Sequence, residues 1–113
     1  MEPDLFFKLI GDQTRLRCLA LLIAHGELCV CELVEATGDS QPKISRHLAL
    51  LRAGGVVDAR RQGQWIFYHL SETLPSWALT SLQSAADGTC KTAPYVDDAK
   101  RFRRLAEPSE LVA

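Results

Sequence analysis

Two cysteines separated by one residue lie in the stretch GELCVCELVEATG, residues 26–38. Thiolates are soft ligands and bind thiophilic ions in preference to oxygen or imidazole ligands. Cys29 and Cys31 are therefore candidate ligands for such an ion. Apolar periodicity predicts a helix over residues 28–37, and neighbours two apart on a helix point about 200° away from each other. We therefore expect that the two thiols do not share a helix face.

The chain has two further cysteines. Cys18 falls in a predicted helix, where we expect a small core residue, and Cys90 falls in a predicted loop. The N-terminus MEPDLFFKLIGD carries acids where an export signal would carry bases, and no apolar run reaches the length of about 18 residues that a membrane span needs. We therefore predict a cytoplasmic protein with free or metal-binding thiols and no membrane partner.

Charge is distributed unevenly along the 113 residues, which carry a net charge of −1. Residues 40–69 hold five basic side chains against one acid, Asp58, so this segment is +4 and the remainder is −5. A local basic segment on a nearly neutral protein is a usable electrostatic footprint for DNA. The sequence offers no nucleophile–base pair, phosphate loop or paired carboxylates, so we expect neither an enzyme nor a catalytic cofactor.

Apolar periodicity predicts most of the chain as helix. The predicted helices cover residues 3–11, 13–26, 28–37, 42–54, 71–87 and 96–107. The candidate N-caps that precede three of them are Asp12, Asp39 or Ser40, and Ser71 or Ser76. The side chains expected in the core recur at helical spacing, and they are Leu16, Leu19, Ala20, Leu22, Ile23, Ile44, Leu48, Leu51, Trp77, Leu79 and Leu82.

Residues 56–70, VVDARRQGQWIFYHL, are rich in β-branched and aromatic residues and predict a β-hairpin with its turn near Gln62 and Gly63. Two short helices joined by a glycine-containing turn and followed by a hairpin are typical of a winged helix-turn-helix, a mainly α fold with a small hairpin (α+β). We predict a DNA-binding and dimerisation domain over residues 1–87. Residues 88–113 form a C-terminal extension that we expect to be partly ordered.

In this motif the second helix enters the major groove of double-stranded DNA, and the first helix braces it. Polar side chains that can reach base edges or phosphates cluster at the start of the second helix and at the hairpin tip. These candidates are Ser40, Gln41, Lys43, Ser45, Arg46, His47, Arg60, Arg61, Gln62 and Gln64. The first and last apolar helices pack within the monomer or form a two-fold interface that matches a palindromic operator.

The chain resembles the ArsR/SmtB family of bacterial metalloregulatory repressors. Four segments carry the resemblance: DQTRLRCLALL (12–22), ELCVCEL (27–33), SQPKISRHLALLRAGGVV (40–57) and RRQGQWIFYHL (60–70). The resemblance implies a homodimer that binds its operator when metal-free and lets go when an ion binds. ELCVCEL is similar to the motif of the branch that senses arsenite and antimonite, which implies As(III) or Sb(III) as the inducer and Cys29 and Cys31 as its ligands.

This chain departs from the best-known arsenite pattern at one position. There a third cysteine follows the pair by three residues, and here that residue is Val34. Cys90 is the first candidate for a third thiolate and Cys18 the second, with two-thiolate binding plus a solvent or cellular thiol as the alternative. We hypothesise that the ion pulls Cys29 and Cys31 together and unwinds or bends the start of their helix. Because that helix braces the recognition helix, ion binding would then cost DNA-binding geometry, with a coupling free energy of typically ~1–3 kcal/mol.

Cadmium, lead or zinc is an alternative signal within the resembled family. Its cadmium-type members carry extra cysteines near the N-terminus, and here no cysteine precedes Cys18. Its zinc-type members use histidine and acidic ligands on the last long helix. That helix offers only Glu72 and Asp87 here, and the three histidines lie elsewhere, at His25, His47 and His69.

A redox signal is the other alternative. In this reading Cys29 or Cys31 oxidises to a disulfide with Cys90, and DNA binding is lost reversibly. A disulfide between Cys29 and Cys31 themselves is expected to be strained, because both are placed on one helix.

Overall fold

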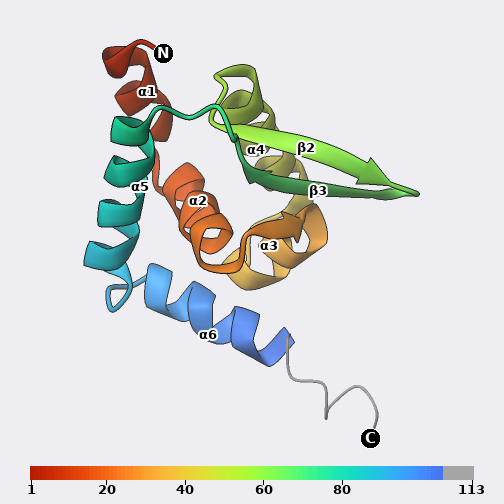
Figure 1. Cartoon of the computed structure of the whole chain (residues 1–113). Coiled ribbons are helices and arrows are strands. Elements are labelled where there is room, and N and C mark those ends of the chain that lie inside the picture. The colour runs from red at the N-terminus through yellow and green to blue at the C-terminus, as the bar shows by residue number, and fades with distance from the viewer. Residues whose placement is uncertain (106–113) are drawn as a thin grey trace, which may run out of the picture.

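The computed structural model describes residues 1–105, which form six helices and a three-stranded antiparallel sheet (Figure 1). The helices are α1 (Pro3–Ile10), α2 (Gln13–His25), α3 (Val30–Thr37), α4 (Gln41–Ala53), α5 (Ser76–Thr89) and α6 (Tyr95–Leu105). The strands are β1 (Glu27–Cys29), β2 (Val57–Gln62) and β3 (Trp65–Leu70). Helices α3 and α4, followed by the β2–β3 hairpin, form the predicted winged helix-turn-helix. Two residues of the predicted helix 96–107 lie outside the described residues.

Local side-chain hydrogen bonds fix where two of the helices begin. The Asp12 carboxylate accepts the backbone N–H of Arg15 at 3.0 Å at the start of α2, and the Ser40 hydroxyl accepts the N–H of Lys43 at 3.4 Å at the start of α4. Both satisfy donors that a helix N-terminus leaves unpaired, so these predicted caps are confirmed.

The predicted cap of the helix after the hairpin is wrong. The residue at the N-cap of α5 is Pro75, and neither Ser71 nor Ser76 fills that position. The Ser71 hydroxyl is hydrogen-bonded to the Thr73 hydroxyl at 2.8 Å instead. The Pro75 carbonyl accepts the first hydrogen bond of the helix, and its fixed φ suits a helix start.

The sheet has the strand order β1-β3-β2, with both neighbouring pairs antiparallel. Gln62 pairs with Trp65 across a two-residue turn whose first residue, Gly63, has φ +63°. This confirms the predicted hairpin and its turn, because such tight hairpins favour glycine at positive φ. The third strand, β1, was not predicted. It pairs with β3, which lies about 40 residues further along the chain.

Leu33 of α3 and Ile44, Leu48 and Leu51 of α4 are fully buried and pack the two helices of the helix-turn-helix together. The last three confirm the predicted core face of this helix. The stripe predicted for α2 is only partly right. Leu19 and Leu22 are buried, but their neighbours Cys18 and Leu21 are buried too, while Leu16, Ala20 and Ile23 are half-buried.

The half-buried side of α2 faces α5, because Leu16 and Ala20 border a small pocket with Leu82 of that helix. On α5 itself Leu82 is buried as predicted, whereas Trp77 stays 38% exposed and Leu79 half-buried. The wider spread of buried positions on α2 arises because this helix packs against α5 on one side and against α3 and α4 on the other, so its apolar surface covers more of its circumference than one stripe.

Helix α6 lies across α2 and α3 at the end of the molecule away from α1 (Figure 1). Its inner face buries Phe102 and the carboxylate of Asp98. The predicted division between residues 87 and 88 falls inside α5, which continues to Thr89. Among the described residues, no helix is both long and apolar enough to cross a membrane.

Replacing Leu48 by alanine tests the core of the helix-turn-helix. Leu48 is fully buried, so we expect Leu48→Ala to lower the free energy of unfolding by about 2–5 kcal/mol through lost burial and a cavity. The matched control is Leu50→Ala, on the same helix at a side chain that is 45% exposed, with an expected change within about 0.5 kcal/mol. Urea unfolding at one protein concentration measures both, and equal losses would contradict the assigned core face.

Candidate functional site

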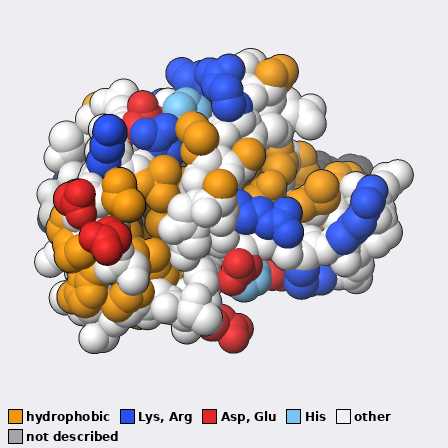
Figure 2. All heavy atoms as spheres, turned by 90° about the horizontal axis from the view of Figure 1, so that it is seen from above, with side chains coloured by type: hydrophobic (Ala, Val, Ile, Leu, Met, Phe, Trp, Pro, Cys, Tyr) orange, Lys and Arg blue, Asp and Glu red, His pale blue; other side chains and the backbone are white. Residues whose placement is uncertain are grey.

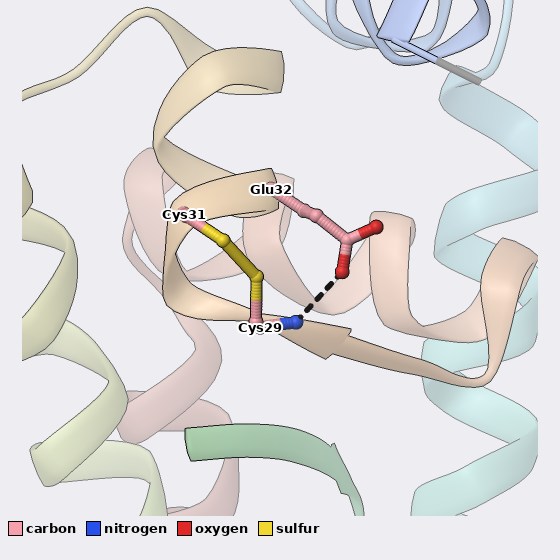
Figure 3. Close-up of a disulfide and its surroundings, with 3 residues drawn as sticks. All are labelled: Cys29, Cys31 and Glu32. Atoms are coloured by element: carbon pink, nitrogen blue, oxygen red, sulfur yellow. Dashed lines mark hydrogen bonds between the residues drawn. A yellow bond between two sulfur atoms is a disulfide. The ribbon is translucent and has the colours of Figure 1, made fainter. Parts of the chain in front are cut away.

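Cys29 and Cys31 lie at the junction where β1 ends and α3 begins (Figure 3). Cys29 occupies the N-cap position of α3 with an extended backbone, φ −80° and ψ 162°, and Cys31 lies in the first turn. Their Cα atoms are 5.4 Å apart, and a disulfide joins their sulfur atoms. When reduced, this backbone holds two thiols together at a helix N-terminus, where the helix dipole favours the thiolate form.

The prediction that residues 28–37 form one helix is wrong at its start. Cys29 instead pairs with Phe67 of β3, and its N–H donates to the Glu32 carboxylate at 2.9 Å (Figure 3). Because Cys29 is extended, the helical rotation that would separate it from Cys31 does not apply. The same finding removes the premise, shared by the expected disulfide strain and the unwinding hypothesis, that both cysteines lie on one helix.

The cysteine pair lines a groove between α3, α4 and the hairpin. Gln41 and Ser45 of α4 form one wall, and Trp65 near the hairpin tip forms another. Cys29 is buried while Cys31 is exposed, so the pair opens toward the groove on one side. A ligand held by these two sulfurs would therefore lie between all three elements of the winged helix-turn-helix.

The other two cysteines lie away from this groove. Cys18 is fully buried in α2, and burial raises the pKa of its thiol to about 12, so it is not a thiolate at neutral pH. Cys90 is exposed at the C-terminal end of α5, where its thiol donates to the Asp87 carbonyl at 3.4 Å. Cys90 borders a different cavity, between α2, α5 and α6, so one protomer does not bring it to the pair.

Within residues 1–105, no group of three or more histidine, cysteine or acidic residues is placed to hold a metal ion. The histidines are separate: the His25 ring packs against Phe102 at 3.8 Å between centroids, and His69 Nδ1 lies 2.9 Å from the Leu70 carbonyl. The described part of the chain thus offers a two-sulfur site and no tetrahedral nitrogen and oxygen site of the zinc type.

The predicted DNA-contacting residues of α4 lie mostly on its outer side. Gln41 and Arg46 are exposed, and Lys43 and Ser45 are half-buried. Lys43 Nζ lies 3.2 Å from the Asp39 carboxylate, which holds its ammonium beside the turn between α3 and α4. Ser40 caps the helix, so its hydroxyl already serves a backbone donor.

His47 is placed differently from its predicted role on the DNA face. Its side chain is 12% exposed and points toward α2, with Nδ1 3.2 Å from Arg15 Nη1 and 3.8 Å from the Asp12 carboxylate. Burial lowers the pKa of His47, with Asp12 acting in the opposite direction. His47 therefore joins α4 to α2 and does not face outward beside Arg46.

The four predicted residues of the hairpin, Arg60, Arg61, Gln62 and Gln64, are all exposed. Figure 2 shows basic side chains along the hairpin and hydrophobic ones gathered at the opposite end of the molecule. Arg60 is tied to β1, because its guanidinium lies 2.7 Å from the Glu27 carboxylate and 4.7 Å from the Phe67 ring centre. Arg61 Nε donates to the Gly63 carbonyl at 3.2 Å within the turn.

Trp65 and Ile66 were not predicted as part of the cysteine site, although both line the groove. They are 50% and 41% exposed, which is high for large apolar side chains. A tryptophan next to a hairpin turn was a usable signal, since solvated tips are usually polar. The cysteine pair that lines the same groove is placed there by strand β1, which was not predicted.

Residues 12–59 match the sequence pattern described as "Bacterial regulatory protein, arsR family". The chain is 57% identical over 103 residues to the arsenic resistance transcriptional regulator ArsR2 of Pseudomonas putida, covering 91% of this chain and 87% of that protein. It is 51% identical over 83 residues to the arsenical resistance operon repressor of Escherichia coli K12, covering 74% and 71%.

Among solved structures, the fold is similar to the AntR antimony-specific transcriptional repressor. The TM-score is 0.63 at 31% sequence identity, and the match covers 72% of this chain and 70% of that one. The likeness includes the winged helix-turn-helix, so the architecture built from α3, α4 and the hairpin is that of known transcriptional regulators.

Thiol alkylation tests the different environments of the cysteines. In the reduced, folded protein at pH 7.5 we expect iodoacetamide to modify the exposed Cys31 and Cys90 and to leave Cys18 unmodified, because burial keeps its thiol protonated. Tandem mass spectrometry over time assigns the label to each site from fragment ions, because Cys18, Cys29 and Cys31 lie on one tryptic peptide, residues 18–43. The control is the same reaction in denaturant, where Cys18 should react as fast as the others; fast labelling of Cys18 in the folded chain would contradict its placement.

Proposed function

The chain belongs to the arsR family of bacterial regulatory proteins, and on that premise we propose that it is an arsenic-responsive transcriptional repressor. It binds operator DNA as a homodimer in the cytoplasm when free of ion. It releases the DNA when As(III) or Sb(III) binds the thiolates of Cys29 and Cys31. The relatives named for arsenic resistance and the neighbour named for antimony support this choice of inducer.

The position of the Cys29–Cys31 pair is the observation that carries the proposal. The two sulfurs meet at the start of α3, in a groove also lined by the recognition helix α4 and the hairpin. Trivalent arsenic and antimony are thiophilic, and two adjacent thiolates form a chelate with a soft ion. The inducer would thus bind within reach of every element that contacts DNA.

Release follows from the strand–helix junction. Cys29 is the last residue of β1 and is paired with Phe67 of β3, so a shift of its backbone moves the hairpin relative to α4. An ion held by both sulfurs replaces the relaxed junction with its own ligand geometry. The hairpin and α4 then lose the relative placement that DNA binding needs. The coupling free energy between ion binding and DNA binding is typically ~1–3 kcal/mol.

The DNA-contacting residues follow from the motif. The start of α4 supplies Gln41, Lys43, Ser45 and Arg46 to the major groove, and Ser40 shapes the helix start. The hairpin supplies Arg60, Arg61, Gln62 and Gln64 to phosphates or the neighbouring minor groove. His47 contributes indirectly, by holding α4 against α2.

The homodimer is proposed to form through α1 and α5. Leu5, Phe7 and Trp77 are 60%, 50% and 38% exposed on these helices, and Trp77 packs edge-to-face on Phe6 at 5.2 Å. An exposed apolar and aromatic cluster of this kind is typical of an interface. A two-fold axis there presents two recognition helices to a palindromic operator. Cys90, at the end of α5, remains our candidate third thiolate only if the partner protomer supplies it.

A redox response is the second candidate, favoured by the disulfide between Cys29 and Cys31. Oxidation of the two thiols forms the S–S bond and releases two protons and two electrons, which a peroxide accepts as it is reduced. The disulfide occupies both inducer ligands, so oxidation and metalloid binding exclude each other.

Release of DNA by arsenite tests the proposed function. The probe is a labelled duplex from directly upstream of the gene that encodes this protein, bound by the reduced protein. We expect added arsenite to lower its fluorescence anisotropy. Cys29→Ser and Cys31→Ser should each bind this duplex normally but need at least about tenfold more arsenite, since losing a ligand removes half the chelate. Unchanged release from both variants would contradict the site.

Cys90→Ser serves as the comparison variant, because it removes an exposed thiol outside the groove. Unchanged release from it indicates two-thiolate binding, and a raised arsenite requirement indicates a third ligand from the partner. Parallel titrations with cadmium, zinc and peroxide identify the signal. Release by one of these without release by arsenite would support the repressor function but contradict arsenite as its inducer.

The two tryptophans of the chain form a matched pair for testing the dimer. Trp77→Ala should raise the dimer dissociation constant at least about tenfold, because it removes an aromatic anchor from the proposed interface. Trp65→Ala, on the hairpin, should leave the dimer unchanged although this side chain is more exposed. Sedimentation velocity over a concentration series measures both, and an unaffected dimer in Trp77→Ala would place the interface elsewhere.

A further inference from the structure

The C-terminal end of α3 is held by arginines from two other helices. Arg17 of α2 donates to the Thr37 carbonyl at 2.6 Å, and Arg101 of α6 donates to the Ala36 carbonyl at 2.7 Å. The last carbonyls of a helix lack partners within the helix and carry partial negative charge. The two guanidinium groups supply those partners and fix where α3 ends.

Asp98 of α6 orients both guanidinium groups. Its Oδ1 accepts from Arg17 Nη2 at 2.7 Å and from Arg101 Nη2 at 2.9 Å, while its Oδ2 accepts from Arg17 Nε at 2.8 Å. The carboxylate is only 1% exposed, so its charge depends on these partners for compensation. Arg17, Asp98 and Arg101 are called the α6 brace below.

The α6 brace continues into the turn of the helix-turn-helix. Arg17 Nη1 lies 3.5 Å from the Asp39 carboxylate, which lies 3.2 Å from the ammonium of Lys43 on α4. The turn itself passes through Gly38 at φ +75°. The chain of charges therefore runs from α6 through α2 to the first turn of the recognition helix.

Stability alone is a weak explanation for this arrangement. A buried ion pair adds little net free energy of folding, because desolvation offsets much of its attraction. The ion pair does fix orientation, because a bidentate arginine–carboxylate pair holds the guanidinium and the carboxylate in one plane. The arginines' remaining N–H groups then point at two carbonyls of α3. The brace is thus suited to setting the angle between α3 and α4.

We propose that Asp98 is a positioning residue for operator recognition: through Arg17 and Arg101 it fixes the end of α3 and thereby the orientation of α4. The inference rests on the proposed function, since it concerns the operator-bound state. It also gives α6 a role in recognition, although α6 lies outside the winged helix-turn-helix.

Asp98→Asn is the primary test, and Asp97→Asn is its matched control. Both substitutions lie on α6 and remove one negative charge, but Asp97 is exposed whereas Asp98 is buried. We measure affinity by anisotropy for the upstream duplex and for a scrambled duplex of equal composition, with folding checked by circular dichroism. Asp98→Asn should weaken upstream binding about tenfold and scrambled binding less than about twofold, while Asp97→Asn leaves both unchanged.

Comparing the two duplexes separates positioning from folding. Partial unfolding lowers both affinities in parallel, and that result would overturn the inference, as would an unchanged upstream affinity. If the unaltered protein does not prefer the upstream duplex over the scrambled one, the proposed function is contradicted. That result comes from the unaltered protein alone, so it is distinct from any result for Asp98→Asn.

Arg101→Gln tests the same proposal if Asp98→Asn does not fold. The Arg101 side chain is 40% exposed, so its loss is tolerable for the fold, yet it removes the Ala36 contact. Arg103→Gln, exposed on the same helix, is its control with the same change in charge. We expect Arg101→Gln to lower the ratio of upstream to scrambled affinity about threefold relative to Arg103→Gln. An equal ratio in the two variants would overturn the inference.

Discussion

Antiparallel pairing between Cys29 and Phe67 is the constraint on which the rest of the site depends. It keeps Cys29 extended, so α3 begins at Val30, two residues later than predicted, and the two cysteine sulfurs converge. The same pairing attaches the hairpin to the helical core through β1. One backbone contact thus sets the placement of both sulfurs and of the hairpin, so under the proposed function the ion and the DNA would act on the same junction.

Helix α3 is held at both ends by different kinds of interaction. At its start the Glu32 carboxylate accepts the Cys29 N–H, and at its end Arg17 and Arg101 donate to carbonyls that have no partner within the helix. Between them Leu33 is fully buried against the recognition helix. A short helix held at both ends in this way is protected against fraying at either end.

Features set by local physics could be predicted from the sequence. Asp12 and Ser40 cap helices through neighbours three residues away, and Gly63 forms the turn through its own backbone freedom. Features that depend on residues far away in the sequence could not be predicted from it. A three-residue strand carries too little pattern to be distinguished from a helix start, and Arg17 and Asp98 are 81 residues apart. The same limit applied to α2, whose buried positions depend on which helices pack on each side of it.

The placement of the cysteines at the edge of the core has a consequence for how such a protein can diversify. Cys31 is exposed and Val34 half-buried, whereas the residues that join α3 to α4 are fully buried. Substitutions at Cys31 and Val34 therefore carry little folding penalty, whereas Cys29 is buried. The proposed ion ligands thus lie apart from the apolar contacts that join α3 to α4, although Gln41 and Ser45 border the same groove as the cysteines. Under the proposed function, a lineage could therefore change its ion ligands at this edge without repacking the core between α3 and α4.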